Sequence, residues 1–259
     1  MAANARYREL LPHPALRPFV DRFWISVDDA APPARRILPD GCIDVLIDLG
    51  REGRSLVVGT MTRASVFAPR GPVRIAAVRF RPAGAVPFLG VAARELTDGT
   101  FTCDDIGARW LAGAPWGETT DAAAAAGSLQ RLLLGRLAAL KRPDPLVAHA
   151  VASLFGPAPP SIEALGRQTG WSRQYLARAF HRHVGVSPKQ LARVARLQRA
   201  VADLQRGRGD GLADAALRLG YFDQAHMARD FRALAGLTPA EARAAAGSIF
   251  PIQSLLTGA

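Results

Sequence analysis

The sequence predicts an α+β chain, with a mainly antiparallel β domain that has a few helices, followed by an all-α domain with two helix-turn-helix units. Two observations support this prediction. The first 120 residues hold short β-rich runs separated by Gly and Pro. The stretch from Ser161 to Arg243 instead holds a unit of about fifty residues that appears twice, with apolar residues at helical spacing. Hydrophobic residues make up 49% of the 259-residue chain, which is enough for a core in each part.

The β-rich part is recognised by its alternating runs. Residues 37–50 predict a turn at Pro39 and then a strand, because Ile43, Val45 and Ile47 alternate with other residue types. Further β-rich runs cover 55–61, 64–69 and 73–82, and the stretches 84–91 and 102–111 have helical character. We therefore expect this half to be a mainly antiparallel β domain with a few helices.

Charged residues in these strands are candidates for an effector pocket. Asp44 and Asp48 share one face of their strand, and Arg79 and Arg81 share a face of another. The carboxylates would favour a cationic effector and the arginines an anionic one. We favour the alternative that these residues lie on a solvated sheet face or pair with one another, so no effector-binding residue is assigned.

The repeated unit contains a short helix, a Gly, an aromatic residue, a polar cap and a second helix. The first copy reads IEALGRQTGW and SRQYLARAF, and the second reads LADAALRLGY and FDQAHMARDF. Gly170 and Gly220 suit the left-handed backbone at a sharp helix end. Ser172 and Asp223 can accept hydrogen bonds from the free amides of the next helix. This order is typical of a helix-turn-helix, whose second helix enters the major groove of DNA.

Each second helix has an outward face that suits DNA. Leu176 and Phe180 mark the buried side of the first, and Met227 and Phe231 that of the second. The residues that we expect to contact DNA are Arg173, Gln174, Arg178, Gln224, His226, Arg229 and Arg232. Gln and Arg suit base edges and phosphates. A merely solvated helix face would also carry Arg, but the repetition of the Gly, cap and Arg positions favours DNA binding.

The segment between the two copies predicts one long helix. Ser187 is a good N-cap, Pro188 fits the first helical position and Gly207 marks the end. A helix of ~18 residues spans roughly 27 Å. That length suits two reading helices about one DNA turn, ~34 Å, apart. One chain could therefore read two adjacent groove segments without dimerising.

Charge and cysteine content narrow the possible functions. Residues 141–259 carry 16 Lys and Arg against 8 Asp and Glu, a net charge of +8, whereas residues 1–140 carry 17 against 14, a net charge of +3. A basic excess on the helical part is expected of phosphate binding. Cys42 and Cys103 provide neither a disulfide framework nor a zinc site. We predict no metal site and no cofactor, and no catalytic residue is proposed because the expected mechanism is DNA readout and recruitment.

The hydropathy pattern argues against a membrane protein. No apolar run reaches the ~18 residues of a membrane span. The amino terminus, MAANARYREL, lacks the apolar core of a signal peptide. We expect a cytoplasmic protein without a membrane partner.

The stretch from Gly170 to Arg243 resembles the DNA-binding domain of AraC/XylS-type transcription regulators. The matching motifs are GWSRQYLARAFHRHVGVSPKQ, RLQRA and GYFDQAHMARDFRALAGLTPAEAR, in that order and spacing. The resemblance implies a seven-helix domain whose two reading helices enter successive major-groove segments. The residues that would contact bases are Gln174 and Arg178 in the first helix, and Gln224, His226 and Arg229 in the second.

Two positions depart from the family pattern. Ala177 stands where many members carry a polar reader, which predicts that the first helix specifies fewer bases. Met227 replaces a more usual Phe, which should pack equally well.

A second likeness covers roughly residues 5–115. The motifs RILPDGCIDVLIDL, VGTM and VRFRPAGAVPFLGV resemble the amino-terminal domain of one subgroup of these regulators. That domain is taken to be a sensory or assembly module, and the likeness identifies no ligand.

The chain is expected to divide into four segments. These are a β-rich sensor or assembly domain over 1–120, an amphipathic helix and linker over 121–143, the DNA-binding domain over 144–246 and a tail over 247–259. Leu129, Leu133 and Leu140 belong to an apolar stripe on the linking helix. This stripe suits either dimer formation or packing against the β domain of the same chain, and we favour packing.

The predicted function is a non-enzymatic transcription regulator that binds specific sequences of double-stranded DNA, and the resemblance favours an activator. The expected partners are double-stranded DNA, RNA polymerase, a small-molecule effector and a second copy of the chain. Two alternatives stay open. One is a DNA-acting repair or alkyl-transfer enzyme with Cys42 or Cys103 as acceptor. The other is a constitutive DNA-binding dimer without an effector.

Overall fold

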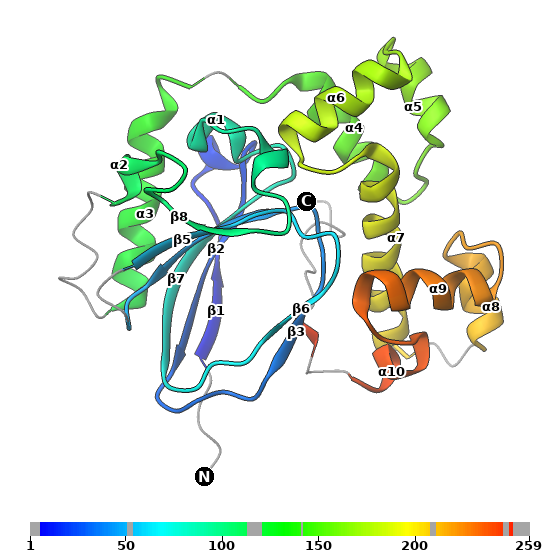
Figure 1. The fold of residues 1–259 in the computed structure, drawn as a ribbon, viewed down its shortest axis with the longest axis horizontal. Helices are drawn as coiled ribbons and strands as arrows, with labels where there is room; N and C mark the ends of the chain where they lie inside the picture. The colour runs from blue at the N-terminus through cyan, green and yellow to red at the C-terminus, as the bar shows by residue number, and fades with distance from the viewer. Residues whose placement is uncertain are drawn as a thin grey trace.

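The computed structural model describes residues 6–50, 54–112, 121–140, 142–207, 211–245 and 249–250, and it shows a β-rich half beside a helical half (Figure 1). The strands are β1 (Arg6–Leu10), β2 (Val20–Asp28), β3 (Arg35–Ile37), β4 (Ile43–Asp48), β5 (Arg54–Val58), β6 (Ser65–Phe67), β7 (Val73–Phe80), β8 (Thr100–Thr102) and β9 (Ile249–Phe250). The helices are η1 (Pro14–Leu16), α1 (Val86–Leu89), η2 (Ala93–Glu95), α2 (Arg109–Ala112), α3 (Ala122–Leu137), α4 (Pro145–Phe155), α5 (Ile162–Thr169), α6 (Arg173–His183), α7 (Pro188–Gln205), α8 (Leu212–Arg218), α9 (Gln224–Ala235) and α10 (Pro239–Ala244). Apart from β9, the tail expected over 247–259 lies outside the described residues.

The main sheet is antiparallel, as predicted. Within the described ranges its strand order is β1-β2-β7-β4-β5-β8, and a smaller sheet has the order β6-β3-β9. The alternation along β4 is confirmed, because Ile43, Val45 and Ile47 are buried while the residues between them are half-buried. Strands β1 and β3 were not predicted, since neither has a clear alternating run.

The helical character expected over 102–111 is wrong for most of that stretch. Thr102 ends β8, and a helix begins only at Arg109. The backbone amide of Thr102 donates to Asp105 Oδ2 at 2.8 Å, and the amide of Asp105 donates to Thr102 Oγ1 at 3.2 Å. Side-chain bonds of this kind hold a turn in competition with a helix.

Helix α3 packs on the sheet of its own chain, as we favoured. It contacts β2 and β7, and Leu129 and Leu133 are fully buried in the same core as Val78 and Phe80. The apolar stripe is therefore largely used inside the β-rich half. No helix in the described part of the chain is long and apolar enough to cross a membrane.

The helical half contains the helices α4 to α10, the seven that the resemblance implied, in the residues described there. Its side chains form two apolar cores. Leu176 and Phe180 belong to the first, with α4 and α5, whereas Met227 and Phe231 belong to the second, with α8. Helix α7 extends across both cores (Figure 1).

Candidate nucleic-acid interface

The first helix-turn-helix unit is closed by a glycine turn. Gly170 has a φ of +69° after α5, a backbone conformation in which a residue with a side chain would be strained. The amide of Trp171 donates to the carbonyl of Gly166 at 3.0 Å, which returns the chain toward α5. Ser172 then caps α6 by accepting from the amide of Tyr175 at 3.2 Å.

The second unit repeats this construction at equivalent positions. Gly220 has a φ of +78°, and the amide of Tyr221 donates to the carbonyl of Ala216 at 2.9 Å. Asp223 caps α9 by accepting from the amide of His226 at 2.6 Å. The repeat in the sequence is therefore also a repeat in hydrogen bonding, which makes α6 and α9 equivalent helices.

Both second helices bury the predicted side and leave the opposite side open. Leu176, Phe180, Met227 and Phe231 are each 0% exposed. Of the residues expected to contact DNA, those with an exposed side chain are Arg173, Gln174, Arg178, Gln224, Arg229 and Arg232, whereas His226 is half-buried. The open faces thus carry guanidinium and amide groups, which suit phosphates and base edges.

An aromatic pair orients the open face of α6. Tyr175 is 46% exposed, and its ring lies edge-on to Trp171 with the centroids 4.9 Å apart. The guanidinium of Arg178 lies over the Tyr175 ring at 5.9 Å. Tyr175 therefore belongs to the candidate interface, which its sequence position alone did not predict.

The environment of His226 limits what this residue can do. Its ring packs edge-on against Tyr221, and its Nδ1 accepts from the amide of Phe222 at 3.3 Å. A neutral histidine whose Nδ1 accepts carries its proton on Nε2 and can only donate there. Any DNA contact from His226 would thus be made to an acceptor, and the ring also holds the turn.

Helix α7 connects the two units rigidly. Leu191 and Ala195 lie in the first core, whereas Leu197 and Val201 lie in the second. Arg193 in α7 also pairs with the buried Asp230 of α9 at 2.8 Å. With 18 residues, α7 has the length predicted for the connection.

The β-rich half contacts the first unit through two threonines. Thr60 Oγ1 donates to the carbonyl of Val184 at 2.7 Å, and Thr97 Oγ1 donates to that of Gly185 at 2.9 Å. Val184 and Gly185 immediately follow α6. The end of the first reading helix is therefore held by the other half of the chain.

The β-rich half also contacts α7 and the second unit. Gln198 Nε2 donates to the carbonyl of Pro39 at 2.6 Å, and the amide of Ala64 donates to the carbonyl of Leu234 at 2.7 Å. Leu38 is 0% exposed within the core of the second unit. We call these contacts, together with those of Thr60 and Thr97, the inter-domain clamp.

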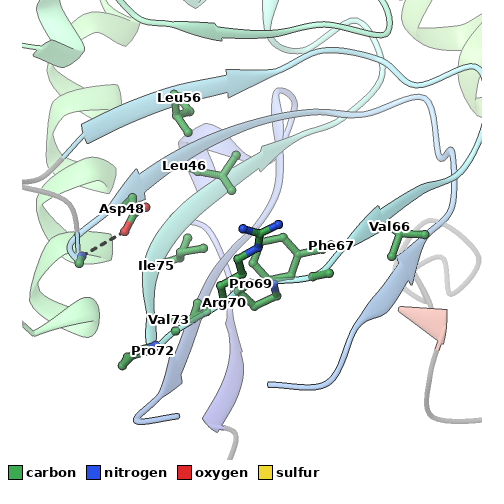
Figure 2. A pocket seen from close by; sticks show the side chains of 13 residues that line it. Leu46, Asp48, Leu56, Val66, Phe67, Pro69, Arg70, Pro72, Val73 and Ile75 are labelled. Carbon is green, nitrogen blue, oxygen red and sulfur yellow. Dashed lines mark hydrogen bonds between the residues drawn. The ribbon is translucent and has the colours of Figure 1, made fainter. Parts of the chain in front are cut away.

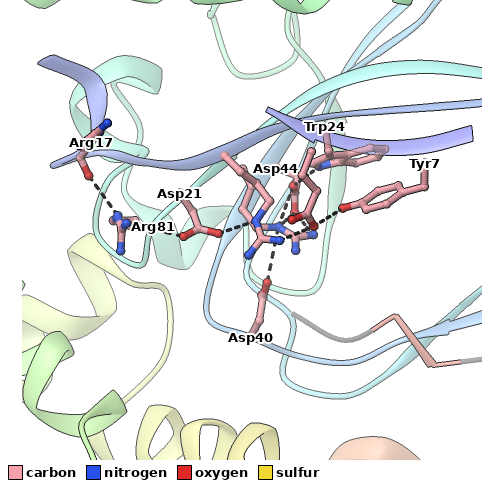
Figure 3. A network of polar contacts seen from close by, with 10 residues as sticks. Tyr7, Arg17, Asp21, Trp24, Asp40, Asp44 and Arg81 are labelled. Carbon is pink, nitrogen blue, oxygen red and sulfur yellow. Dashed lines mark hydrogen bonds and ion pairs between the residues drawn. The ribbon is translucent and has the colours of Figure 1, made fainter. Parts of the chain in front are cut away.

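The turn at Pro39 is tied to a charged network inside the β-rich half (Figure 3). Asp40 accepts from the amide of Cys42 at 2.9 Å and lies 3.7 Å from Arg79, which also pairs with Asp44 at 3.1 Å. Burial lowers the pKa of Arg79, but Asp44 and Asp40 outweigh it and raise that pKa well above its usual range. The Asp44–Arg79 pair agrees with the interpretation that these charged residues pair with one another.

Neither cysteine has the environment of a reactive acceptor. Cys42 is 3% exposed and Cys103 is 1% exposed. Burial, and next the carboxylate of Asp40, raise the pKa of Cys42 well above its usual range, whereas burial raises the pKa of Cys103 to about 11. Because a thiolate is the nucleophile, both residues behave as small core side chains.

A pocket of about 670 Å³ lies on the face of the sheet opposite α3 (Figure 2). Leu46, Leu56 and Ile75 form its floor, and residues 66–72 form its other wall. Arg70 belongs to this second wall (Figure 2). The lining is mainly apolar with one cationic and one anionic side chain, Arg70 and Asp48, and its size suits a small organic molecule.

Two sequence families match the chain. Residues 165–245 match a family described as a helix-turn-helix domain, and residues 8–102 match a domain of unknown function, DUF6597. The helix-turn-helix match is of AraC type. No curated protein matches the chain significantly.

Solved structures of ToxT from Vibrio cholerae are similar over nearly the whole chain. ToxT from strain O395 has 10% identity, covers 99% of this chain and 98% of its own, and gives a TM-score of 0.40. Wild-type ToxT bound to an unsaturated fatty acid has 11% identity, covers 93% of this chain and 91% of its own, and gives a TM-score of 0.38.

Proposed function

We propose that this DNA-binding transcription regulator, which carries an AraC-type helix-turn-helix domain behind a DUF6597 domain, reads two adjacent major-groove segments with α6 and α9. The observation that supports this is the sharing of α7 between the two apolar cores. A helix built into both cores holds the two reading helices in one relative position. A fixed pair would engage DNA from one side without a second copy of the chain.

Selection of bound sites from random double-stranded DNA tests this function. The full chain should select one site with two short conserved blocks whose centres lie about one helical turn, ~10.5 base pairs, apart. The sextuple variant with Arg173, Gln174, Arg178, Gln224, Arg229 and Arg232 changed to Ala should select none. A single short block, or two blocks at variable spacing, would contradict the paired reading.

We infer that the β-rich half modulates DNA binding through the inter-domain clamp. The clamp holds the end of α6 and the end of α9 at once, through Val184 and Leu234. Ala64 of the clamp directly precedes β6, and β6 leads into the wall of the 670 Å³ pocket. An effector in that pocket would displace the segment from Thr60 to Ala64, which contacts the ends of both reading helices.

Activation by contact with RNA polymerase completes the proposal. With α6 and α9 on DNA, the β-rich half would stay free to take up an effector while the complex meets polymerase. In vitro transcription from a promoter that carries the selected site should increase on addition of the full chain. A decrease at every position of the site relative to the promoter would make the protein a repressor.

A further inference from the structure

A second cavity, separate from the pocket on the sheet, lies between the two halves of the chain. It has a volume of about 640 Å³. One wall comes from the β-rich half, at Arg81 and Pro82, and the others come from α4 and α7. We call it the arginine cleft, because Arg81, Arg199 and Arg206 all line it.

The lining of the arginine cleft has three arginines and one acid, so its charge is positive. Asp203 is the acid among its lining residues, and it already pairs with Arg218 at 3.0 Å. Arg199 is half-buried, and its Nη1 donates to the carbonyls of Leu154 and Gly156 at 3.2 and 3.4 Å. Burial, and next the neighbouring Arg196, lower the pKa of Arg199. A guanidinium in this position would gain from an anion.

The other two arginines can reach toward the cavity. Arg206 is exposed just after α7. Arg81 stands at the end of the charged network in Figure 3, where its Nε donates to the carbonyl of Arg17 at 3.0 Å. Its Nη2 forms an ion pair with Asp21 at 3.8 Å, a distance too long for a hydrogen bond. The guanidinium of Arg81 therefore still has N–H groups that could donate to another acceptor.

An apolar wall faces these charges. Val151 and Phe155 of α4 line the cavity together with Pro18 and Pro82. Guanidinium groups beside an apolar surface suit a molecule with an oxyanion at one end and a hydrocarbon body. The cavity volume falls within the range of small-molecule sites, ~300–1,000 Å³.

We propose that the arginine cleft binds a small amphipathic anion, whose carboxylate or phosphate pairs with Arg81 and Arg206 and whose apolar body packs on α4. The ligand joins the β-rich half to α7 and thereby stabilises the arrangement that the inter-domain clamp sets. The effect of the ligand on DNA binding rests on the proposed function, whereas binding of the anion to the arginine cleft does not.

Calorimetry on the full chain without DNA tests the site. The probes are 4-phenylbutyrate and phenyl phosphate, with 4-phenylbutyramide as the uncharged counterpart. One or both anions should bind with one-to-one stoichiometry, and the amide should bind at least tenfold more weakly. The stronger anion identifies the preferred headgroup. Equal binding of the amide, or no binding of either anion up to millimolar concentration, would overturn the proposal.

Substitutions locate the bound probe. Arg206→Gln, at an exposed position, should weaken binding of the anion about tenfold, and Arg81→Gln should act in the same direction. Arg94→Gln is the matched control, because Arg94 is exposed in the β-rich half and pairs with Glu95. Unchanged binding in both cleft variants would place the probe elsewhere and refute the site.

The same samples separate this inference from the proposed function. Fluorescence anisotropy with the selected DNA site reports DNA binding independently of the probe. DNA binding without probe binding would refute the arginine cleft alone. Probe binding by a chain that does not prefer any DNA sequence would leave the cleft standing and refute the proposed function.

Discussion

Arg178 and Arg229 occupy equivalent positions on α6 and α9, and both are exposed. We predict that Arg178→Ala and Arg229→Ala each weaken binding to the selected site by ~1–3 kcal/mol and relax the preference at one base position. Anisotropy titrations against a set of single-base variants of the site would measure both effects. Arg94→Ala serves as a charge-matched control. An equal loss on every DNA sequence would instead make the residue a phosphate contact.

His183 gives the stability a pH dependence. Burial, and next the charge of Arg182, lower its pKa below the ordinary value of 6.5, while Asp144 opposes them. As the pH falls, the unfolded chain therefore takes up the proton before the folded chain does. The contribution of His183 to the free energy of unfolding is complete above pH 6.5. It is lost as the pH falls through the lowered pKa of His183 in the folded state.

We predict that the urea midpoint of the full chain falls between about pH 7 and pH 5, and that His183→Gln reduces this fall. Equilibrium unfolding at several pH values would measure it. His181→Gln, at the exposed histidine two positions earlier, should retain the fall. The same fall in the His183→Gln variant would show that other groups cause it.

At the scale of elements, the contact between the end of α6 and the β-rich half can be tested with a pair of glycines. Gly185 has a φ of +94°, and a Cβ there would lie 2.7 Å from Thr97 Oγ1 and 3.0 Å from the carbonyl oxygen of Ala93. Gly170 has a φ of +69° with nothing within 4 Å of such a Cβ. Alanine at either position is strained by about 1–2 kcal/mol.

Only Gly185→Ala should also push the two halves apart. We predict that it destabilises the full chain by ~1–3 kcal/mol more than Gly170→Ala does, because the added methyl group has no space. Urea unfolding of the two variants would measure the difference. Equal destabilisation would mean that the contact between Gly185 and Thr97 is loose in solution.

At the scale of the whole molecule, both cores of the helical half include side chains from the β-rich half. Leu38 fills the core of the second unit, and Ala83 belongs to the core of the first. Loss of a buried leucine side chain typically costs about 2–5 kcal/mol. The helical half should therefore fold more weakly alone than within the full chain.

We predict that the fragment from Asp144 onward binds DNA but unfolds at a lower urea concentration than the full chain. Its DNA affinity should fall steeply between about 50 and 200 mM salt, since phosphate contacts release counterions. Anisotropy over a salt series and urea unfolding of both chains would measure these effects. A fragment as stable as the full chain would show that Leu38 contributes little.

The amino-acid sequence by itself determined the two helix-turn-helix units and their buried faces. The residues that mark the helix ends in these units are close in sequence to the groups they affect. Gly170, Ser172, Gly220 and Asp223 each act on backbone groups a few residues away. The sequence also determined where α7 begins, since Ser187 caps the helix and Pro188 occupies its first turn. The turn at residues 102–105 was missed, because Thr102 and Asp105 suit either a turn or a helix end.

Only the tertiary structure decided how the two halves meet. The bond between Gln198 and Pro39 joins residues 159 positions apart, and the burial of Leu38 in the second unit depends on similarly distant neighbours. The arginine cleft likewise combines Arg81 with Arg199 and Arg206. Such contacts cannot be predicted from the sequence near either partner, because the local pattern around a Leu or an Arg does not depend on which distant surface its side chain contacts.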